Sequence, residues 1–262
     1  TFIHPFDDKN VIAGQGTIGL EIVSQLPDVE AVVVPVGGGG LISGVAYAVK
    51  SLNPSIKVYG VQAEGAPSMV NSLRDHTIER LPSVSTVADG IAVKEPGKLT
   101  YDICSKYVDE IVTVNDDEIC AAILRLLERE KLSSEGAGAT SIAAVMFNKI
   151  PVKGKKTVCI VSGGNIDVTL LNRVINRGLL KSGRLCSIEI ELEDEPGQLV
   201  EVSSCIARVG GNVTGVHYDR MSIMKKVSQC ILKIDIETKN HEHIEQIKQE
   251  LQKHGFTLYA QE

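Results

Sequence analysis

The first part of the chain alternates short, uniformly apolar runs with longer segments in which apolar residues recur at helical spacing. Residues 31–36 form such a run, rich in β-branched side chains, which is typical of a strand buried on both faces of a parallel sheet. The pattern therefore predicts an α/β fold, a parallel sheet with helices on both faces. The predicted strands are 31–36, 58–62, 110–114 and 157–161, and the predicted helices are 11–26, 41–52, one that carries Ile119, Ile123, Leu126 and Leu127, 137–147 and 168–179.

The last part of the chain has a different pattern. Residues 187–193 alternate apolar and polar side chains, as expected of a strand with one buried face. The elements predicted here are strand 187–193, helix 198–209, strands 212–218 and 227–236, helix 241–254 and strand 256–259. This βαββαβ order predicts a ferredoxin-like unit.

Glycine content separates the two parts. Residues 1–183 hold nineteen of the 24 glycines, and the short polar segment 181–184 is typical of a linker. We therefore expect one domain over residues 1–183 and a second over residues 184–262. Because the chain begins with Thr1 rather than Met and has no signal-peptide pattern there, we expect it to be a piece of a longer protein.

Charge and cysteine usage narrow the choice of partners. The formal net charge is −6, the basic residues form no block, and the apolar runs are too short to span a bilayer. These features argue against binding to nucleic acid or to a membrane. The six cysteines follow no metal-binding spacing, which favours reduced core residues and a cytoplasmic location. His4, Asp7 and Asp8 resemble a metal-binding cluster, but their place beside Pro5 near the chain start favours a solvated segment.

Four consecutive glycines, residues 37–40, join the predicted strand 31–36 to a predicted helix. A backbone without Cβ atoms can approach an anion closely, and the amides of a helix N-terminus favour negative charge. We interpret this loop as a phosphate site formed by Gly37, Gly38, Gly39, Gly40 and Leu41. Because no lysine follows the glycines, nucleoside triphosphate hydrolysis is not favoured. An NAD site with Glu64 on the ribose stays open, although Ser43 stands where the dinucleotide fingerprint has its third glycine.

Two further motifs are candidates for chemistry. Ser162-Gly163-Gly164-Asn165 follows the predicted strand 157–161, and ligands of parallel sheets collect at the carboxyl ends of strands. The alternative is a glycine-rich loop in which Asn165 caps the next helix. Glu135 stands at the start of the predicted helix 137–147, where an acid is either functional or simply a partner of the helix dipole.

Taken together, these motifs resemble those of the pyridoxal-phosphate (PLP)-dependent serine/threonine dehydratase family, which has the tryptophan-synthase-β fold. The resemblance covers almost all of residues 1–180, and residues 185–262 resemble an ACT regulatory domain. A dehydratase domain followed by an ACT domain indicates a threonine dehydratase (threonine ammonia-lyase) more than a serine racemase. The matching segments are residues 3–8, 13–19, 37–41, 88–93, 135–139 and 162–165, together with Asp194-x-Pro196-Gly197-x-Leu199.

The resemblance implies PLP as cofactor and the deamination of L-threonine, and of L-serine, to 2-oxobutanoate, pyruvate and ammonia. It assigns the cofactor phosphate to residues 37–41, the pyridine nitrogen to Ser162 and the positioning of the ring to Glu135. A neutral hydroxyl does not stabilise a protonated pyridine as a carboxylate does, so the ring is a weaker electron sink. This favours elimination of the β-hydroxyl over transamination.

The resemblance also marks what this sequence lacks. The family's Schiff-base lysine lies in a Ser-x-Lys-x-Arg-Gly segment, and no such segment occurs here. We therefore assign no catalytic residue and expect the chain alone to be inactive. Glu64 and Ser68 fall where some relatives bind a cation, but Val70 stands in place of the further acid of those sites.

The ACT resemblance implies regulation by an amino-acid or nucleotide effector and assembly into a homo-oligomer, either a dimer or a tetramer. Asp194, Gly197 and Asn212 are the candidate effector residues on this basis. An amino-acid sensor or regulatory fragment is the alternative function, and dimerisation without any ligand is the alternative for this part of the chain.

Overall fold

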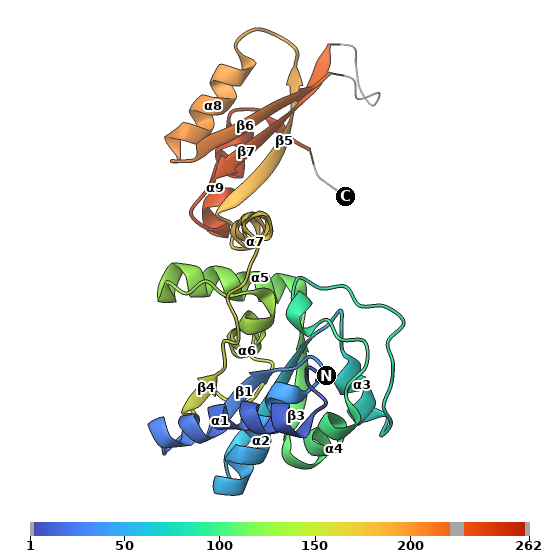
Figure 1. Cartoon of the computed structure of the whole chain (residues 1–262). Helices are drawn as coiled ribbons and strands as arrows, with labels where there is room; N and C mark the ends of the chain where they lie inside the picture. Colours follow the sequence, from blue (N-terminus) through green and yellow to red (C-terminus); the bar gives the residue numbers. More distant parts are fainter. Residues whose placement is uncertain (1–2, 221–227, 260–262) are drawn as a thin grey trace. The chain divides into compact units, whose positions relative to one another are not determined.

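The computed structural model of the chain describes residues 3–220 and 228–259 (Figure 1). It divides into two compact units, Thr1–Val174 and Ile175–Glu262. The division falls inside helix α7 (Val168–Lys181), whereas the sequence placed the domain boundary after this helix. Within the described ranges, no helix has both the length and the apolar character that crossing a membrane requires.

A four-stranded parallel sheet forms the centre of the first unit, with strand order β3-β2-β1-β4. Val33 of β1 lies opposite Tyr59 of β2 on one side and Cys159 of β4 on the other. All of β1 is buried, as its continuous apolar run predicts. The strands are β1 (Ala31–Pro35), β2 (Lys57–Ala63), β3 (Glu110–Val114) and β4 (Thr157–Cys159).

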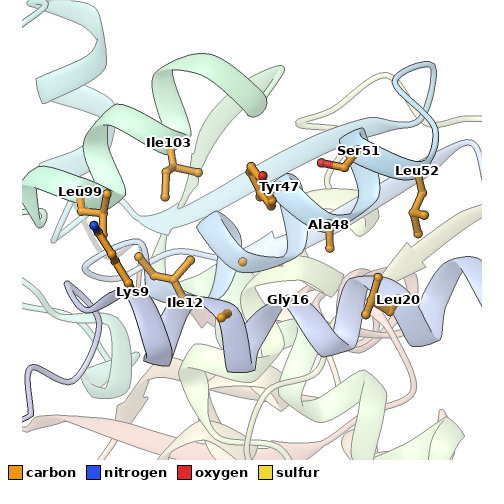
Figure 2. Close-up of a pocket in the computed structure, with 12 residues that line it drawn as sticks. Lys9, Ile12, Gly16, Leu20, Tyr47, Ala48, Ser51, Leu52, Leu99 and Ile103 are labelled. Atoms are coloured by element: carbon orange, nitrogen blue, oxygen red, sulfur yellow. The ribbon is translucent and has the colours of Figure 1, made fainter.

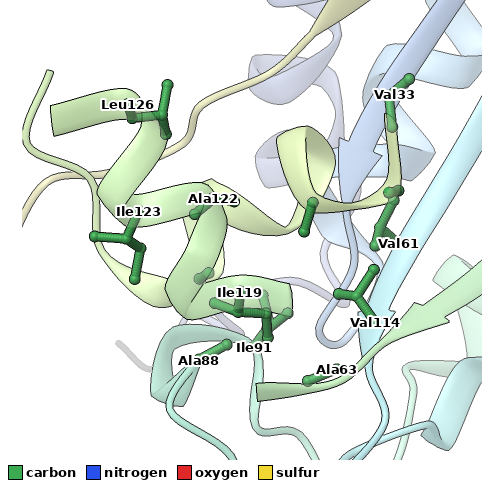
Figure 3. Close-up of a cluster of buried hydrophobic side chains, with 14 of the residues drawn as sticks. Val33, Val61, Ala63, Ala88, Ile91, Val114, Ile119, Ala122, Ile123 and Leu126 are labelled. Atoms are coloured by element: carbon green, nitrogen blue, oxygen red, sulfur yellow. The ribbon is translucent and has the colours of Figure 1, made fainter. Parts of the chain in front are cut away.

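Helices cover both faces of this sheet, which confirms the predicted α/β arrangement. Successive residues of β1 face opposite sides: Val33 belongs to a buried cluster with Ile119 and Ile123 of α5 (Figure 3), whereas Val32 belongs to another cluster with Ile42 of α2. The helices of this unit are α1 (Lys9–Gln25), α2 (Gly40–Leu52), α3 (Ser68–Arg74), the 3₁₀ turn η1 (Asp89–Ile91), α4 (Lys98–Tyr107), α5 (Asp116–Arg125), the π-helical turn η2 (Leu126–Glu130) and α6 (Gly136–Met146).

The sequence analysis missed the helical elements between β2 and β3. These are α3, η1 and α4. Two of them are too short for a helical period to emerge, and α4 has only two fully buried residues, Thr100 and Cys104, on its inner face. The remaining predicted helices and strands of this unit occur, with ends shifted by a few residues at most.

The second unit has the predicted βαββαβ order. Its sheet is antiparallel with strand order β6-β7-β5-β8, and its core includes Ile190, Leu232 and Ile247. The predicted strand 227–236 begins at Val227, which lies outside the described residues. The elements are β5 (Leu185–Glu193), α8 (Gln198–Arg208), β6 (Asn212–Asp219), β7 (Gln229–Glu237), α9 (His241–Lys253) and β8 (Thr257–Leu258).

Two glycines test the close packing of α1 against α2. A Cβ atom at Gly44 of α2 would collide with the Ile12 carbonyl oxygen and lie 2.6 Å from the Gly16 amide nitrogen, so we expect Gly44→Ala to lower the free energy of unfolding by about 1–3 kcal/mol. Gly14 is exposed on α1 with nothing within 4 Å of an added Cβ, so Gly14→Ala should raise the free energy of unfolding by about 0.5–1 kcal/mol. Chemical denaturation measures both values, and similar effects of the two substitutions would contradict this packing.

Candidate functional site

The tetraglycine loop, residues 37–40, leads from the end of β1 into α2. Gly39 caps the helix with φ of +97°, a conformation that glycine adopts without strain, and no side chain bonds to the first turn. The amides of Gly38, Gly39, Gly40 and Leu41 have no hydrogen-bond acceptor among the described residues. Unpaired donors at the positive end of a helix are the arrangement that binds phosphate, so the loop fits the phosphate group that the sequence assigns to it.

Neighbouring side chains fill the space beside the α-carbons of this loop. A Cβ atom at Gly38 would collide with the Phe6 ring, and one at Gly40 would lie 2.8 Å from the Phe6 Cβ. A Cβ atom at Gly39 would lie 2.7 Å from the Met69 Cε. Side chains are therefore excluded at these positions, while the amide groups are left without partners.

The segment before α1 packs against the loop through Phe6 and against α4 through Asp7. Because His4, Asp7 and Asp8 are half-buried while Ile3 and Pro5 are exposed, the expectation of a solvated segment is only partly correct. The Asp7 carboxylate accepts hydrogen bonds from the first amides of α4, and the amide of Asp7 donates to Nδ1 of His4 at 2.9 Å. Phe6 packs on the loop as described. The acidic residues act as backbone caps rather than as metal ligands: Asp8 likewise accepts from the amide of Asn10 at 2.8 Å.

The structure brings Glu135 and the Ser162 motif to the same edge of the sheet as the glycine loop. The Glu135 amide donates to the Gly163 carbonyl oxygen at 3.2 Å, and a Cβ atom at Gly163 would lie 2.7 Å from Oε1 of Glu135. A Cβ atom at Gly90 would lie 3.1 Å from the same Oε1, and one at Gly37 would lie 3.1 Å from the Cα of Ile91. A continuous series of contacts thus links the loop through η1 to Glu135 and Gly163.

The Ser162 side chain is half-buried, and its hydroxyl has no hydrogen-bond partner among the described residues. Strand β4 is shorter than predicted, but Ile160 still donates from its amide to Val33 of β1, and its carbonyl oxygen accepts from the Ser141 hydroxyl. These bonds keep Ser162 beside the end of β1. The alternative role of Asn165 as a helix cap is wrong, because the Asp167 carboxylate accepts from the Leu170 amide at the start of α7.

The candidate cation residues are only partly suited to that role. Glu64 is exposed, whereas Ser68 is fully buried and its Oγ lacks a hydrogen-bond partner. The described residues contain no group of three or more histidine, cysteine, aspartate or glutamate side chains that could hold a metal ion. A cation at Glu64 and Ser68 remains a prediction.

The candidate effector residues do not form one cluster within a single chain. Asp194 follows the end of β5 and pairs with Arg220, with 3.0 Å between Oδ2 and Nε. Asn212 lies opposite Glu237, the residue that also pairs with Leu185 at the start of β5. Asn212 is therefore at the other end of the sheet from Asp194. Gly197, with φ of +100°, begins α8 close to Asp194 in the sequence, and nothing lies within 4 Å of a Cβ added there.

A large groove lies apart from these candidate residues. It has a volume of about 730 Å³, and its apolar walls come from α1, α2 and α4 (Figure 2). None of the predicted site residues lines it. Its main apolar side chains are Ile12, Leu20, Tyr47, Leu52, Leu99 and Ile103.

Burial makes Cys104 and Cys159 poor nucleophiles. All six are free thiols, as expected. Burial raises the pKa of Cys104 to about 12 and that of Cys159 to about 11. Both therefore remain protonated at neutral pH, where only a thiolate would be reactive.

Comparison with known proteins gives the class to which this site belongs. A family model described as pyridoxal-phosphate-dependent enzyme matches residues 1–163. The chain therefore belongs to the PLP-dependent enzymes, and PLP rather than NAD is the cofactor of this family.

Individual relatives carry the comparison further. Over 257 residues, the chain is 53% identical to an L-threonine ammonia-lyase of Thermotoga maritima, an alignment that covers 98% of this chain and 64% of the relative. The chain is also similar to the processed form of threonine deaminase isoform 2 from Solanum lycopersicum (42% identity, TM-score 0.65, 69% of this chain and 50% of that one). A third similarity is to maize serine racemase (36% identity, TM-score 0.61, 68% of this chain and 56% of that one). The chain thus spans less than two thirds of the length of each of these proteins.

Gly163 tests the contact between Glu135 and the Ser162 segment. Gly163→Ala would strain a residue with φ of +130° and place a methyl group against the Glu135 carboxylate. Gly154→Ala is the matched control, with φ of +80° and nothing within 4 Å of the added Cβ. We expect the control to lose about 1–2 kcal/mol of stability from backbone strain. Gly163→Ala should lose about 1–3 kcal/mol of stability beyond that of the control, and it should also bind PLP more weakly. Thermal unfolding and PLP titration measure these effects; equal losses in both variants would exclude the contact.

Proposed function

We propose that this chain carries the cofactor-binding part and the regulatory part of a PLP-dependent L-threonine ammonia-lyase, which also deaminates L-serine. The observation that carries the proposal is the contact series from the tetraglycine loop through η1 to Glu135 and Gly163. The name of the Thermotoga relative and its alignment with 98% of this chain support threonine as the substrate. The products are 2-oxobutanoate from threonine, pyruvate from serine, and ammonia.

Each group of the site has a distinct role in this proposal. PLP, when bound, withdraws electrons from the α-carbon of an amino-acid substrate. The amides of Gly38, Gly39, Gly40 and Leu41 bind the phosphate, and the Ser162 hydroxyl forms a hydrogen bond with the pyridine nitrogen. Because the hydroxyl is neutral, it does not hold a proton on that nitrogen, which favours loss of the β-hydroxyl over transfer of the amino group.

Glu135 is the charged side chain of the proposed site. Its amide is held by Gly163, and its carboxylate lies against Gly90 and Gly163. We assign it the role of positioning the pyridine ring between these two backbone segments.

Serine racemisation is the second candidate activity. The similarity to maize serine racemase favours it, because that enzyme shares 36% identity over 68% of this chain. Alignment of the Thermotoga lyase with 98% of the chain, which includes the second unit, favours deamination.

The six free thiols support a reducing, cytoplasmic location.

The missing lysine gives the sharpest test of this assignment. We expect the chain to bind PLP reversibly, to form no stoichiometric covalent adduct after borohydride reduction, and to release no 2-oxobutanoate from L-threonine. Intact-mass spectrometry and absorption titration measure the first two expectations. In the same titration, Ser162→Ala should weaken PLP binding by roughly threefold to tenfold through loss of one neutral hydrogen bond.

The matched control for this titration is Asn165→Ala, because Asn165 is exposed three residues beyond Ser162. It should leave PLP affinity unchanged. A single covalent adduct at one lysine after borohydride reduction would refute the inference that this chain lacks the Schiff-base lysine. Equal PLP affinities of the Ser162→Ala and wild-type chains would refute the role of Ser162.

For the second unit, we propose an ACT-type regulatory function with homo-oligomer formation through the exposed edge of β6. Val216 and Tyr218 of this edge strand are 38% and 40% exposed, and an edge strand has unpaired backbone groups that can join a second copy. Nothing lies within 4 Å of a Cβ added at Gly197, so we place the small amino-acid or nucleotide effector at this open turn beside Asp194. Dimerisation without an effector is the alternative.

Calorimetry distinguishes the two roles of this unit. We expect heat of binding with at least one of isoleucine, valine, threonine or AMP, and a loss of that heat in Asp194→Ala. Asn212→Ala is the control, because Asn212 lies at the other end of the sheet within one chain, and it should bind normally. A loss of heat in this variant as well would indicate that the partner copy contributes Asn212. The absence of heat for all four ligands, with a dimer in light scattering, would favour dimerisation alone.

A further inference from the structure

Helix α4 holds one peptide group of the tetraglycine loop in place. The Gly38 carbonyl oxygen accepts a hydrogen bond from the Thr100 hydroxyl at 2.6 Å and another from the Gly97 amide at 3.3 Å. Thr100 is fully buried, and a Cβ atom at Gly39 would lie 2.8 Å from the Thr100 Cβ. The Gly38 carbonyl is therefore tied to the start of α4 by two donors.

The orientation of this carbonyl also sets the direction of an amide. The C=O of Gly38 and the N–H of Gly39 belong to one planar trans peptide group, so they point in opposite directions. With the oxygen held toward α4, the Gly39 amide points away from α4. Peptide groups between glycines meet little steric resistance to rotation, and a rotated group would present its oxygen to an anion instead of its N–H.

Asp7 determines where α4 begins. Its carboxylate accepts hydrogen bonds from the amides of Lys98, Leu99 and Thr100 at 3.1, 2.9 and 3.2 Å. Gly97 lies directly against the same carboxylate, so that no side chain fits there. An acid in this position pairs the free donors of the first helical turn and interacts favourably with the helix dipole. Asp7 therefore fixes the turn that carries Thr100.

We propose that Thr100 is a positioning residue for the phosphate of the cofactor, acting through the Gly38 carbonyl, and that Asp7 acts through Thr100. This inference rests on the proposed function, because it concerns the phosphate of PLP. Thr100 turns the Gly39 amide toward the phosphate, and Asp7 places Thr100. Loss of the Thr100 hydroxyl should therefore weaken ligands that carry a phosphate and spare those that do not.

Two substitutions of Thr100 separate its hydroxyl from its shape. Thr100→Val keeps the branched side chain without the donor, and Thr100→Ser keeps the donor. The full chain is titrated with PLP and with pyridoxal, which has the same aldehyde and ring but no phosphate. We expect Thr100→Val to raise the Kd for PLP roughly tenfold and to leave that for pyridoxal within about twofold. Thr100→Ser should keep the wild-type ratio of the Kd for pyridoxal to the Kd for PLP.

A second pair of variants tests the route through the helix cap. Asp7→Asn weakens the cap of α4 and should lower the same ratio, which decides the matter even if Thr100→Val does not fold. Asp8→Ala is the matched control, because Asp8 caps α1 by accepting from the amides of Asn10 and Val11. It should lower thermal stability by a similar amount and leave the ratio unchanged.

The outcomes separate this inference from the proposed function. A folded Thr100→Val chain with the wild-type ratio overturns the positioning role, and so does an Asp8→Ala chain that lowers the ratio as much as Asp7→Asn. In both cases PLP binding itself would stand. A wild-type chain that binds PLP no more tightly than pyridoxal overturns the phosphate site and this inference together.

Discussion

The peptide groups between β1 and α2 meet two demands that conflict in most sequences. Their amides must stay without protein acceptors, although Gly38, Gly39 and Gly40 are buried, and their α-carbons must pass close to Phe6 and Met69. A buried amide without a partner costs free energy, which a ligand oxygen offsets when it accepts the bond. The rest of the first unit can be understood from this constraint, because the sheet, η1 and α4 all present groups that hold these peptides in one orientation.

Local signals in the sequence were sufficient for the elements that build this loop. The apolar run of β1 identifies a strand buried on both sides, and four glycines before a helical period predict an anion site. The parallel sheet then implies that the ends of β1 and β4 meet, because both strands run in the same direction. The register of β1 with β4 agrees with this prediction, even though β4 ends two residues earlier than predicted.

Long-range contacts account for what the sequence did not reveal. Asp7 caps a helix more than 90 residues away, and no spacing rule connects an acid with the first turn of α4 at that distance. The cap is also the reason that α4, with its short buried face, forms where it does. The candidates Asp194 and Asn212 show the converse: both match turn residues of a βαββαβ unit, but strand register separates them along the sheet of one chain.

The side chains nearest the α-carbons of the loop are apolar or neutral, namely Phe6, Met69, Ile91, Val93 and Thr100. None of these contributes a positive charge, so in the proposed phosphate site oriented amide dipoles carry the attraction at these contacts. The attraction between a cationic side chain and a phosphate changes little when the side chain shifts slightly. A peptide dipole that rotates, in contrast, reverses the sign of its interaction with the phosphate. A site of this kind therefore depends on rigid peptide orientation more than on charge, which explains why buried packing and a buried hydroxyl surround glycines that have no preferred conformation of their own.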